Sequence, residues 1–369
     1  MTKRRLILWS PQGAYSGNRF DGCTTRRRAI RSVLSQEPLQ VLHLESRGGL
    51  YDGTAQLLRL LHFLSKVEAH EQLIFFYPDF PLFHPPRQLK VPLLRLILKR
   101  IKTLKERLNV QFVVDVVDLP RWQAPCLGYE LRMAEGPLRA AEKEIFSLAD
   151  RVILPTESLA NLLVEDLSLG ADKLAILPNG LPHCLAKVCK DVRGEPAYFY
   201  AGDLSLSRNR RVKELIGTFL ANAPEEAVLH LCGAEGEWIV SEEYGSTVFY
   251  HGHLSEEECL RLASQCDFGL IPYPESDYFQ WCFPSKVGLY LAAALPILAS
   301  QLLETGKVLK ELAAGECKKL VSFGEFFSQG KELSSSFDRN ELRKRVTDWN
   351  WSGQVRSAFS VCPAESEVH

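Results

Sequence analysis

The segment from Phe268 to Ser300 constrains the fold of this chain most strongly. It reads Phe268-Gly-Leu-Ile-Pro-Tyr-Pro274 and then, after a polar stretch, Pro284-Ser-Lys-Val-Gly-Leu-Tyr-Leu-Ala-Ala-Ala-Leu-Pro-Ile-Leu-Ala-Ser300. This order predicts a buried strand, a polar loop, a helix that begins at Pro-Ser-Lys, and a second strand that begins at Pro296. The segment therefore indicates a βαβ unit of a parallel sheet.

The start of this helix is a candidate anion site. Open parallel sheets bind ligands at the carboxyl ends of their strands, where the N-terminus of a helix offers unpaired N–H groups and partial positive charge. Lys286 stands in the first turn and suits a diphosphate. A plain βαβ unit with Lys286 on a solvated edge fits the same spacing, so the spacing alone leaves both interpretations open.

Predicted strands alternate with helical patterns along the chain, which favours a doubly wound α/β architecture. In the first half we expect strands at 5–9, 39–44, 73–77, 112–117, 151–154 and 174–177. In the second half we expect them at 197–202, 228–232, 247–250, 268–272, 297–299 and 319–321. The stretch 178–196 reads as a connection. The 369 residues suffice for two domains, each able to bury its own core.

The pattern at 268–300 resembles the nucleotide-sugar half of GT-B-fold glycosyltransferases, and among them the bacterial hexosyl- and galactofuranosyltransferases of surface glycan assembly. The resemblance implies two Rossmann-like, doubly wound parallel-sheet domains that face each other across a cleft. It implies an acceptor-binding domain at 1–190, a nucleotide-sugar-binding domain at 191–340, and a tail at 341–369 whose helix crosses back onto the first domain.

The resemblance also implies donor-binding residues. Lys286 is expected to bind the donor diphosphate, with Ser285 beside it. Gly202 ends the first strand of the second half, and Arg208 is the expected cationic partner of Lys286, although Arg210, Arg211 and Lys213 follow closely. Two cations would neutralise the charge that builds on a departing nucleoside diphosphate, so we expect neither a metal nor a cofactor.

Three further loops follow predicted strands at the same face. Gly13-Ala-Tyr-Ser-Gly-Asn18 could bring a flexible backbone to a phosphate or sugar, with Gly13 and Ser16 as candidate donor contacts, or it could be an ordinary turn. His251-Gly-His253 and Cys232-Gly-Ala-Glu-Gly236 each end a strand, and the resemblance implies nucleotide contacts there, for which His253 is our candidate. The two histidines lack further obvious ligands for a metal.

The sequence departs from the family at one point. Many GT-B enzymes carry a Glu-x7-Glu pair whose second glutamate holds the donor ribose, whereas this chain has Trp281 and Leu289 at those positions. Ribose recognition must therefore come from elsewhere, and Glu275 and Asp277 are candidates.

Asp118 is the candidate catalytic base. It ends the strand-like run Val113-Val-Asp-Val-Val-Asp118, where a carboxylate at the cleft could deprotonate an acceptor hydroxyl. The position matches the proposed base of some inverting GT-B enzymes. Alternatively, Asp118 or Asp115 caps the following loop.

The basic residues of the first half gather in 92–108. Residues 1–185 hold 25 Lys and Arg against 19 Asp and Glu, whereas the remainder is acidic. The apolar residues of 92–108 recur at helical spacing, so this amphipathic helix could contact an anionic membrane or simply cover a sheet with a solvated basic face. No aromatic residue interleaves with the charges, which argues against nucleic acid.

The cysteines and the N-terminus favour a cytoplasmic location, with a peripheral contact at the inner face of the membrane through 92–108. The ten cysteines include no Cys-x2-Cys pair, and several sit in apolar segments as small hydrophobes. The apolar stretch after Met1-Thr-Lys-Arg-Arg5 is too short for a signal peptide.

The sequence as a whole predicts a metal-independent hexosyltransferase. Its expected partners are a nucleotide sugar, with UDP-hexose favoured, and a glycan or lipid-linked acceptor. Two alternatives share the fold: a non-catalytic GT-B-like partner subunit, which the missing glutamate pair favours, and a nucleotide-sugar 2-epimerase.

Overall fold

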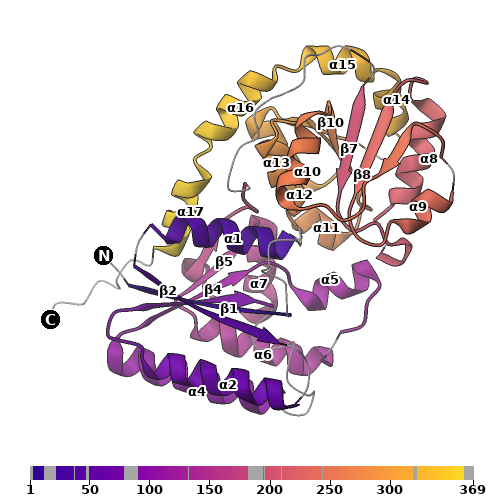
Figure 1. Cartoon of the computed structure of the whole chain (residues 1–369). Helices are drawn as coiled ribbons and strands as arrows, with labels where there is room; N and C mark the ends of the chain where they lie inside the picture. Colours follow the sequence, from indigo (N-terminus) through magenta and orange to yellow (C-terminus); the bar gives the residue numbers. More distant parts are fainter. Residues whose placement is uncertain are drawn as a thin grey trace.

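Two parallel sheets form the framework of the protein. The computed structural model describes residues 3–11, 22–36, 38–46, 50–78, 90–131, 133–181, 194, 196–208, 210–242, 244–318 and 322–360. Within these ranges each sheet has six strands, and each lies in its own α/β layer structure (Figure 1). The predicted fold class, two doubly wound α/β domains, is confirmed.

The first sheet has the strand order β2-β1-β3-β4-β5-β6, with all neighbours parallel. Its strands are β1 (Arg4–Pro11), β2 (Leu39–Ser46), β3 (Gln72–Tyr77), β4 (Gln111–Val116), β5 (Arg151–Leu154) and β6 (Leu174–Ile176). Its helices are α1 (Gly22–Leu34), α2 (Leu50–Ser65), α4 (Lys90–Leu108), α5 (Pro120–Leu127), α6 (Glu135–Leu148) and α7 (Glu157–Leu167). Side chains of β3 alternate between two cores, because successive strand residues point to opposite faces.

The second sheet has the order β12-β11-β10-β7-β8-β9. Its strands are β7 (Ala197–Ala201), β8 (Val228–Cys232), β9 (Val248–Tyr250), β10 (Phe268–Ile271), β11 (Ile297–Ala299) and β12 (Gly315–Cys317). Its helices include α8 (Val212–Asn222), α9 (Glu237–Ser241), α10 (Glu256–Ser264), α11 (Asp277–Trp281), α12 (Ser285–Ala292), α13 (Leu303–Leu312) and α14 (Phe323–Ser328). A capping box of Ser255 and Glu258 opens α10.

Two sequence expectations for this sheet differ from the observed elements or lie outside them. The last strand is predicted at 319–321, which lies outside the described residues, whereas β12 begins at Gly315. A side chain at Gly315 would place its Cβ 1.9 Å from the carbonyl oxygen of Ile297, so glycine lets β12 approach β11. The polar loop predicted after Pro274 is wrong in part, because residues Asp277–Trp281 form α11.

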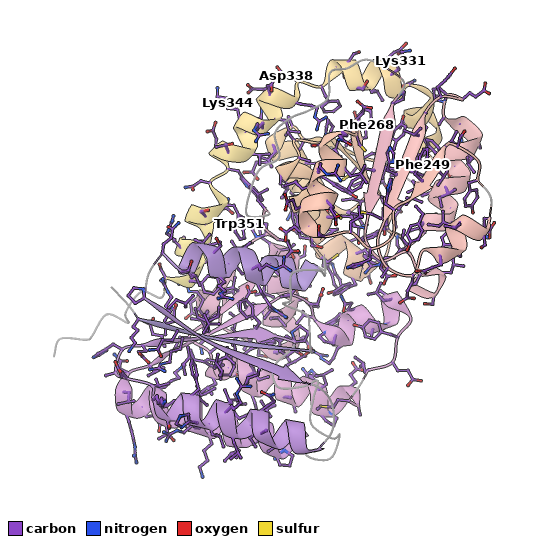
Figure 2. All side chains as sticks on the ribbon, in the orientation of Figure 1. Phe249, Phe268, Lys331, Asp338, Lys344 and Trp351 are labelled. Atoms are coloured by element: carbon purple, nitrogen blue, oxygen red, sulfur yellow. The ribbon has the colours of Figure 1, made fainter. Side chains whose placement is uncertain are left out.

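The C-terminal helices carry the chain back to the first domain, as predicted. After α15 (Gly330–Ser336) and α16 (Arg339–Asp348), α17 (Trp351–Phe359) packs beside α1 (Figures 1 and 2). The Trp351 ring is 5% exposed and its Nε1 donates a hydrogen bond of 3.1 Å to the carbonyl of Pro178. Gly180 leaves room for this ring, since a Cβ there would lie 1.9 Å from it.

Helix α4 contains the basic segment 92–108. Its apolar stripe of Leu94, Ile97, Ile101 and Leu104 is buried in the core of the first domain. Lys105 pairs with Asp150 at 2.8 Å, while Lys99 and Lys102 are exposed. The apolar stripe thus covers the sheet, and only the basic face remains for an outside partner. Among the described helices, none combines the length and apolarity needed to cross a bilayer.

Candidate active site

A cavity of about 870 Å³ lies between the two domains. Its walls come from the carboxyl ends of strands in both sheets, which is where open parallel sheets bind ligands. The predicted residues Asp118, Gly202, His253, Ser285 and Lys286 all line it. Gly13 and Ser16 lie outside the described residues, as does the side chain of Arg208.

Lys286 is a buried cation with no ion-pair partner in the described part of the protein. Its side chain is in the first turn of α12, is 4% exposed, and its Nζ has no hydrogen-bond partner among the described residues. The Nζ lies 3.8 Å from the ring centroid of Tyr200 and 4.7 Å from that of Tyr273. Burial, and next the charge of Arg210, lower the Lys286 pKa well below its ordinary value. An anion in the cavity would relieve both effects.

Arg210 is the second cation of the cavity. Its guanidinium lies 4.6 Å from the ring centroid of Tyr273, and its Nε is buried without a hydrogen-bond partner among the described residues. Arg211 and Lys213 are engaged elsewhere, with Glu214 at 2.7 Å and Glu242 at 2.6 Å respectively. Of the three basic residues that the sequence offered beside Arg208, the structure brings Arg210 to Lys286.

Glycines let the strand ends close around these cations. Gly202 has a φ of 149°, which L side chains rarely adopt, and a Cβ there would lie 2.8 Å from the Lys286 Nζ. Gly233 has a φ of 150°, and a Cβ there would lie 1.6 Å from the carbonyl oxygen of Gly202. Any larger residue at either position would push the β7 and β8 loops away from the anion site.

Asp118 follows β4 and lines the cavity from the first domain. The Tyr278 hydroxyl, from α11 of the second domain, donates a hydrogen bond of 2.7 Å to its Oδ1. Burial raises the Asp118 pKa, and the bond from Tyr278 opposes that rise. Asp115, by contrast, is fully buried and forms a bidentate ion pair with Arg26, at 2.6 and 2.9 Å, so it serves the core of the first domain.

The aromatic residues of α11 connect the domains. Tyr278 is buried in the core cluster of the first domain, and the Trp281 ring meets that of Trp122 edge-on, with centroids 6.0 Å apart. Thr156 donates a hydrogen bond to the Trp281 carbonyl. Sequence reasoning missed this contact; the signal was the aromatic run Tyr278-Phe279 and Trp281 within a stretch read as polar.

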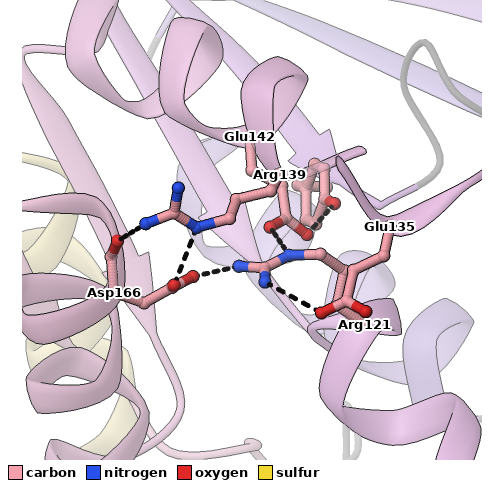
Figure 3. Close-up of polar contacts among 6 residues, drawn as sticks. Arg121, Glu135, Arg139, Glu142 and Asp166 are labelled. Carbon is pink, nitrogen blue, oxygen red and sulfur yellow. Dashed lines mark hydrogen bonds and ion pairs between the residues drawn. The ribbon is translucent and has the colours of Figure 1, made fainter. Parts of the chain in front are cut away.

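A buried ion network holds α5, which forms part of the cavity wall in the first domain (Figure 3). Arg121 of α5 donates a hydrogen bond of 2.6 Å to the Glu142 carboxylate, which also accepts one of 2.7 Å from the Tyr77 hydroxyl. Arg121 also pairs with Asp166, which Arg139 contacts at 2.9 Å. Removing one partner from such a network would leave a buried charge without compensation, which is costly. The network therefore fixes the position of α5.

The residues considered for contacts with the ribose and the base of the donor take different positions relative to the cavity. Leu289 is 1% exposed inside α12, and of the described residues that line the cavity none is Glu275 or Asp277. His253 is exposed at the cavity rim, while His251 contacts His230 at 2.9 Å. The described residues contain no group of three or more His, Cys, Asp or Glu side chains that could hold a metal.

The two domains, the cleft and the returning C-terminal helix are those of the GT-B fold, and comparison with solved structures supports this directly. The lipopolysaccharide outer core galactosyltransferase WaaB, in its apo form, is similar with a TM-score of 0.61 and 11% identity, over 96% of this chain and 98% of that one. Anabaena HepE, in complex with UDP and glucose, is similar with a TM-score of 0.54 and 12% identity, over 98% and 96%. These likenesses confirm the predicted fold.

A sequence relative agrees with the fold. TuaH of Bacillus subtilis strain 168, named as a candidate teichuronic acid biosynthesis glycosyltransferase, is 24% identical over 270 residues. The match covers 65% of this chain and 64% of that relative, slightly under two thirds of its length. No protein-family model matches the chain. The resemblance to bacterial GT-B glycosyltransferases of surface glycans, read from 268–300, therefore recurs over a larger part of the chain.

Proposed function

We propose that this protein is a glycosyltransferase that moves a hexose from a nucleotide sugar, UDP-hexose, to a glycan or lipid-linked acceptor in surface glycan biosynthesis. The observation that carries the proposal is the pair of basic side chains in the cavity between the domains: Lys286, whose Nζ is buried, and the half-buried Arg210, whose Nε is buried; neither atom has a hydrogen-bond partner among the described residues. A buried charge without a partner is costly. A diphosphate supplies the missing charge, and the start of α12 adds N–H groups that suit the same anion.

The names of the similar proteins support the acceptor side of the proposal. WaaB is named for the lipopolysaccharide outer core and TuaH for teichuronic acid biosynthesis, so both names concern bacterial surface glycans. HepE was solved with UDP and glucose, which supports a UDP-hexose donor.

In the proposed reaction, Asp118 removes the proton of the acceptor hydroxyl, the acceptor oxygen bonds to the anomeric carbon of the sugar, and the bond between that carbon and the diphosphate oxygen breaks. Lys286 and Arg210 stabilise the negative charge that builds on the leaving UDP, so the chain's own cations act where other enzymes use Mg²⁺. Because both domains contribute to the cavity, substrate binding between them would exclude water and direct the sugar to the acceptor.

Calorimetry with UDP and a panel of UDP-hexoses tests the proposal. We expect Lys286→Ala to weaken UDP binding about 10- to 150-fold, as for other charge-assisted contacts. Lys344→Ala, an exposed change on α16, is the matched control and should leave UDP affinity unchanged. If Lys286→Ala is folded and binds UDP as the wild type does, Lys286 does not hold the diphosphate.

The alternatives give different results in the same experiments. A non-catalytic partner subunit is favoured if the folded wild type binds no nucleotide sugar at all. A 2-epimerase would convert the bound sugar without any acceptor, which product analysis would detect.

A further inference from the structure

The donor site needs a partner for the ribose of the nucleotide, and the structure offers one that the sequence did not. A ribose presents two neighbouring hydroxyls, and a carboxylate can accept hydrogen bonds from such hydroxyls, as an acidic residue does in dinucleotide sites. Leu289 and Trp281 cannot do this, since Leu289 is buried among apolar side chains and Trp281 packs on Trp122. The carboxylates that line the cavity are therefore the candidates.

Four described carboxylates line it: Asp118, Glu130, Asp203 and Glu235. Asp118 and Glu130 belong to the first domain, and Asp118 already accepts a hydrogen bond of 2.7 Å from Tyr278. Asp203 accepts a hydrogen bond of 2.9 Å from the Ser205 N–H. Glu235 is exposed, and within the described ranges nothing forms a hydrogen bond or ion pair with its carboxylate.

Backbone hydrogen bonds tie the Glu235 loop to the anion site. The Gly202 N–H donates to the Cys232 carbonyl at 2.9 Å, and the Leu204 N–H donates to the Ala234 carbonyl at 3.0 Å. The loop after β8 therefore lies directly against the loop after β7, where a Cβ at Gly202 would come within 2.8 Å of the Lys286 Nζ. A nucleoside diphosphate held by Lys286 carries its ribose one bridging oxygen beyond the α-phosphate, so the ribose would lie close to the loops that line the anion site.

We infer that Glu235 accepts hydrogen bonds from the ribose hydroxyls of the donor nucleotide. The inference rests on the proposed function, because it needs a nucleoside diphosphate at Lys286. The loop after β8 then performs the ribose recognition that the start of α12 does not provide. This assignment also gives Glu235 a specificity role, since a carboxylate toward the ribose favours ribonucleotides over nucleotides that lack the hydroxyls.

The test compares UDP with 2′,3′-dideoxy-UDP by calorimetry. We expect the wild type to prefer UDP about 10- to 150-fold, the range of hydrogen bonds to a charged group. Glu235→Ala should lose that preference, while its affinity for dideoxy-UDP stays within about twofold of the wild type. Glu237→Ala, two residues along the same segment and outside the cavity lining, is the matched control and should keep the preference.

The outcomes separate the two proposals. A folded wild type that fails to bind UDP overturns the proposed function and with it this inference. A wild type that binds UDP, with Glu235→Ala retaining the full preference for UDP over dideoxy-UDP, overturns the role of Glu235 alone. Equal affinity of the wild type for both nucleotides has the same meaning, because no residue then reads the ribose hydroxyls.

Discussion

The unusual state of Lys286 predicts that UDP binding takes up a proton. In the free protein, burial first and Arg210 second lower the Lys286 pKa well below 10.5. A bound diphosphate places negative charge beside the Nζ and raises that pKa again. Between the two pKa values the free protein has lost the proton and the complex holds it. UDP affinity should therefore fall as pH rises through this window, by up to about tenfold per pH unit for one proton.

The groups around Lys286 do not obscure this effect. The phenols of Tyr200 and Tyr273, which flank the Nζ, have pKa values raised mainly by burial, so they stay neutral. The pKa of the Cys232 thiol is also raised, first by its contact with Cys259. The terminal phosphate of UDP has a second pKa of about 6, so it is ionised throughout.

Calorimetry in buffers of different ionisation enthalpy measures both the affinity and the protons taken up. A range from about pH 7 to about pH 9.5 approaches the ordinary lysine pKa from below. Lys286→Met is the matched variant, since it keeps an apolar stem and removes the titrating group. It should bind UDP weakly and with a flat pH profile. The same slope in Lys286→Met as in the wild type, or no proton uptake by the wild type, would refute the reasoning.

The lowered pKa of Lys286 also makes the free energy of unfolding depend on pH. The unfolded chain binds a proton at Lys286 up to about pH 10.5, while the free folded protein releases it earlier, so this group makes the free energy of unfolding rise with pH across that window. Saturating UDP should remove this contribution, and chemical denaturation with and without UDP would show the difference.

Three further predictions concern the first domain and the contact between domains. Asp118→Asn should slow acceptor-dependent release of UDP from the preferred UDP-hexose about 10²- to 10⁴-fold with donor affinity retained, and near-normal turnover would mean that the carboxylate is structural. Tyr278→Phe removes the 2.7 Å hydrogen bond that opposes the raised Asp118 pKa, so the acidic limb of the pH–rate profile should move to higher pH. If the limb does not move, Asp118 is not the group whose titration produces it. If the basic face of α4 contacts anionic lipid, replacing Lys99, Arg100 and Lys102 by Gln should cost about 1 kcal/mol per charge and reduce flotation with anionic but not neutral vesicles. Equal flotation of both proteins would leave α4 as a solvated wall.

Local patterns were enough to predict most helices and strands, because the helices repeat their apolar residues at helical spacing and the buried strands are short apolar runs. Buried strands such as 268–271 and 151–154 are short apolar runs, and Ser255 with Glu258 marks a helix start in one short motif. Errors arose where long-range contacts decide the structure. Residues 277–281 are expected to be loop, but Tyr278 is buried because the first domain supplies a core for it.

The candidate site also contains residues that local sequence marks and residues that only long-range contacts identify. Lys286 could be found from sequence because a lysine in the first turn of a helix after a parallel strand has a local physical meaning. The choice of Arg210 could not, since several basic residues stand within 208–213 and only the ring of Tyr273, far along the chain, selects one of them. Glu235 was harder still, because its meaning depends on backbone bonds from Gly202 and Leu204 that bring two loops together. Of the residues that we propose to bind the donor, Lys286 thus carries a local signal, whereas Arg210 and Glu235 depend on the packing of segments that are distant in the chain or belong to neighbouring strand ends.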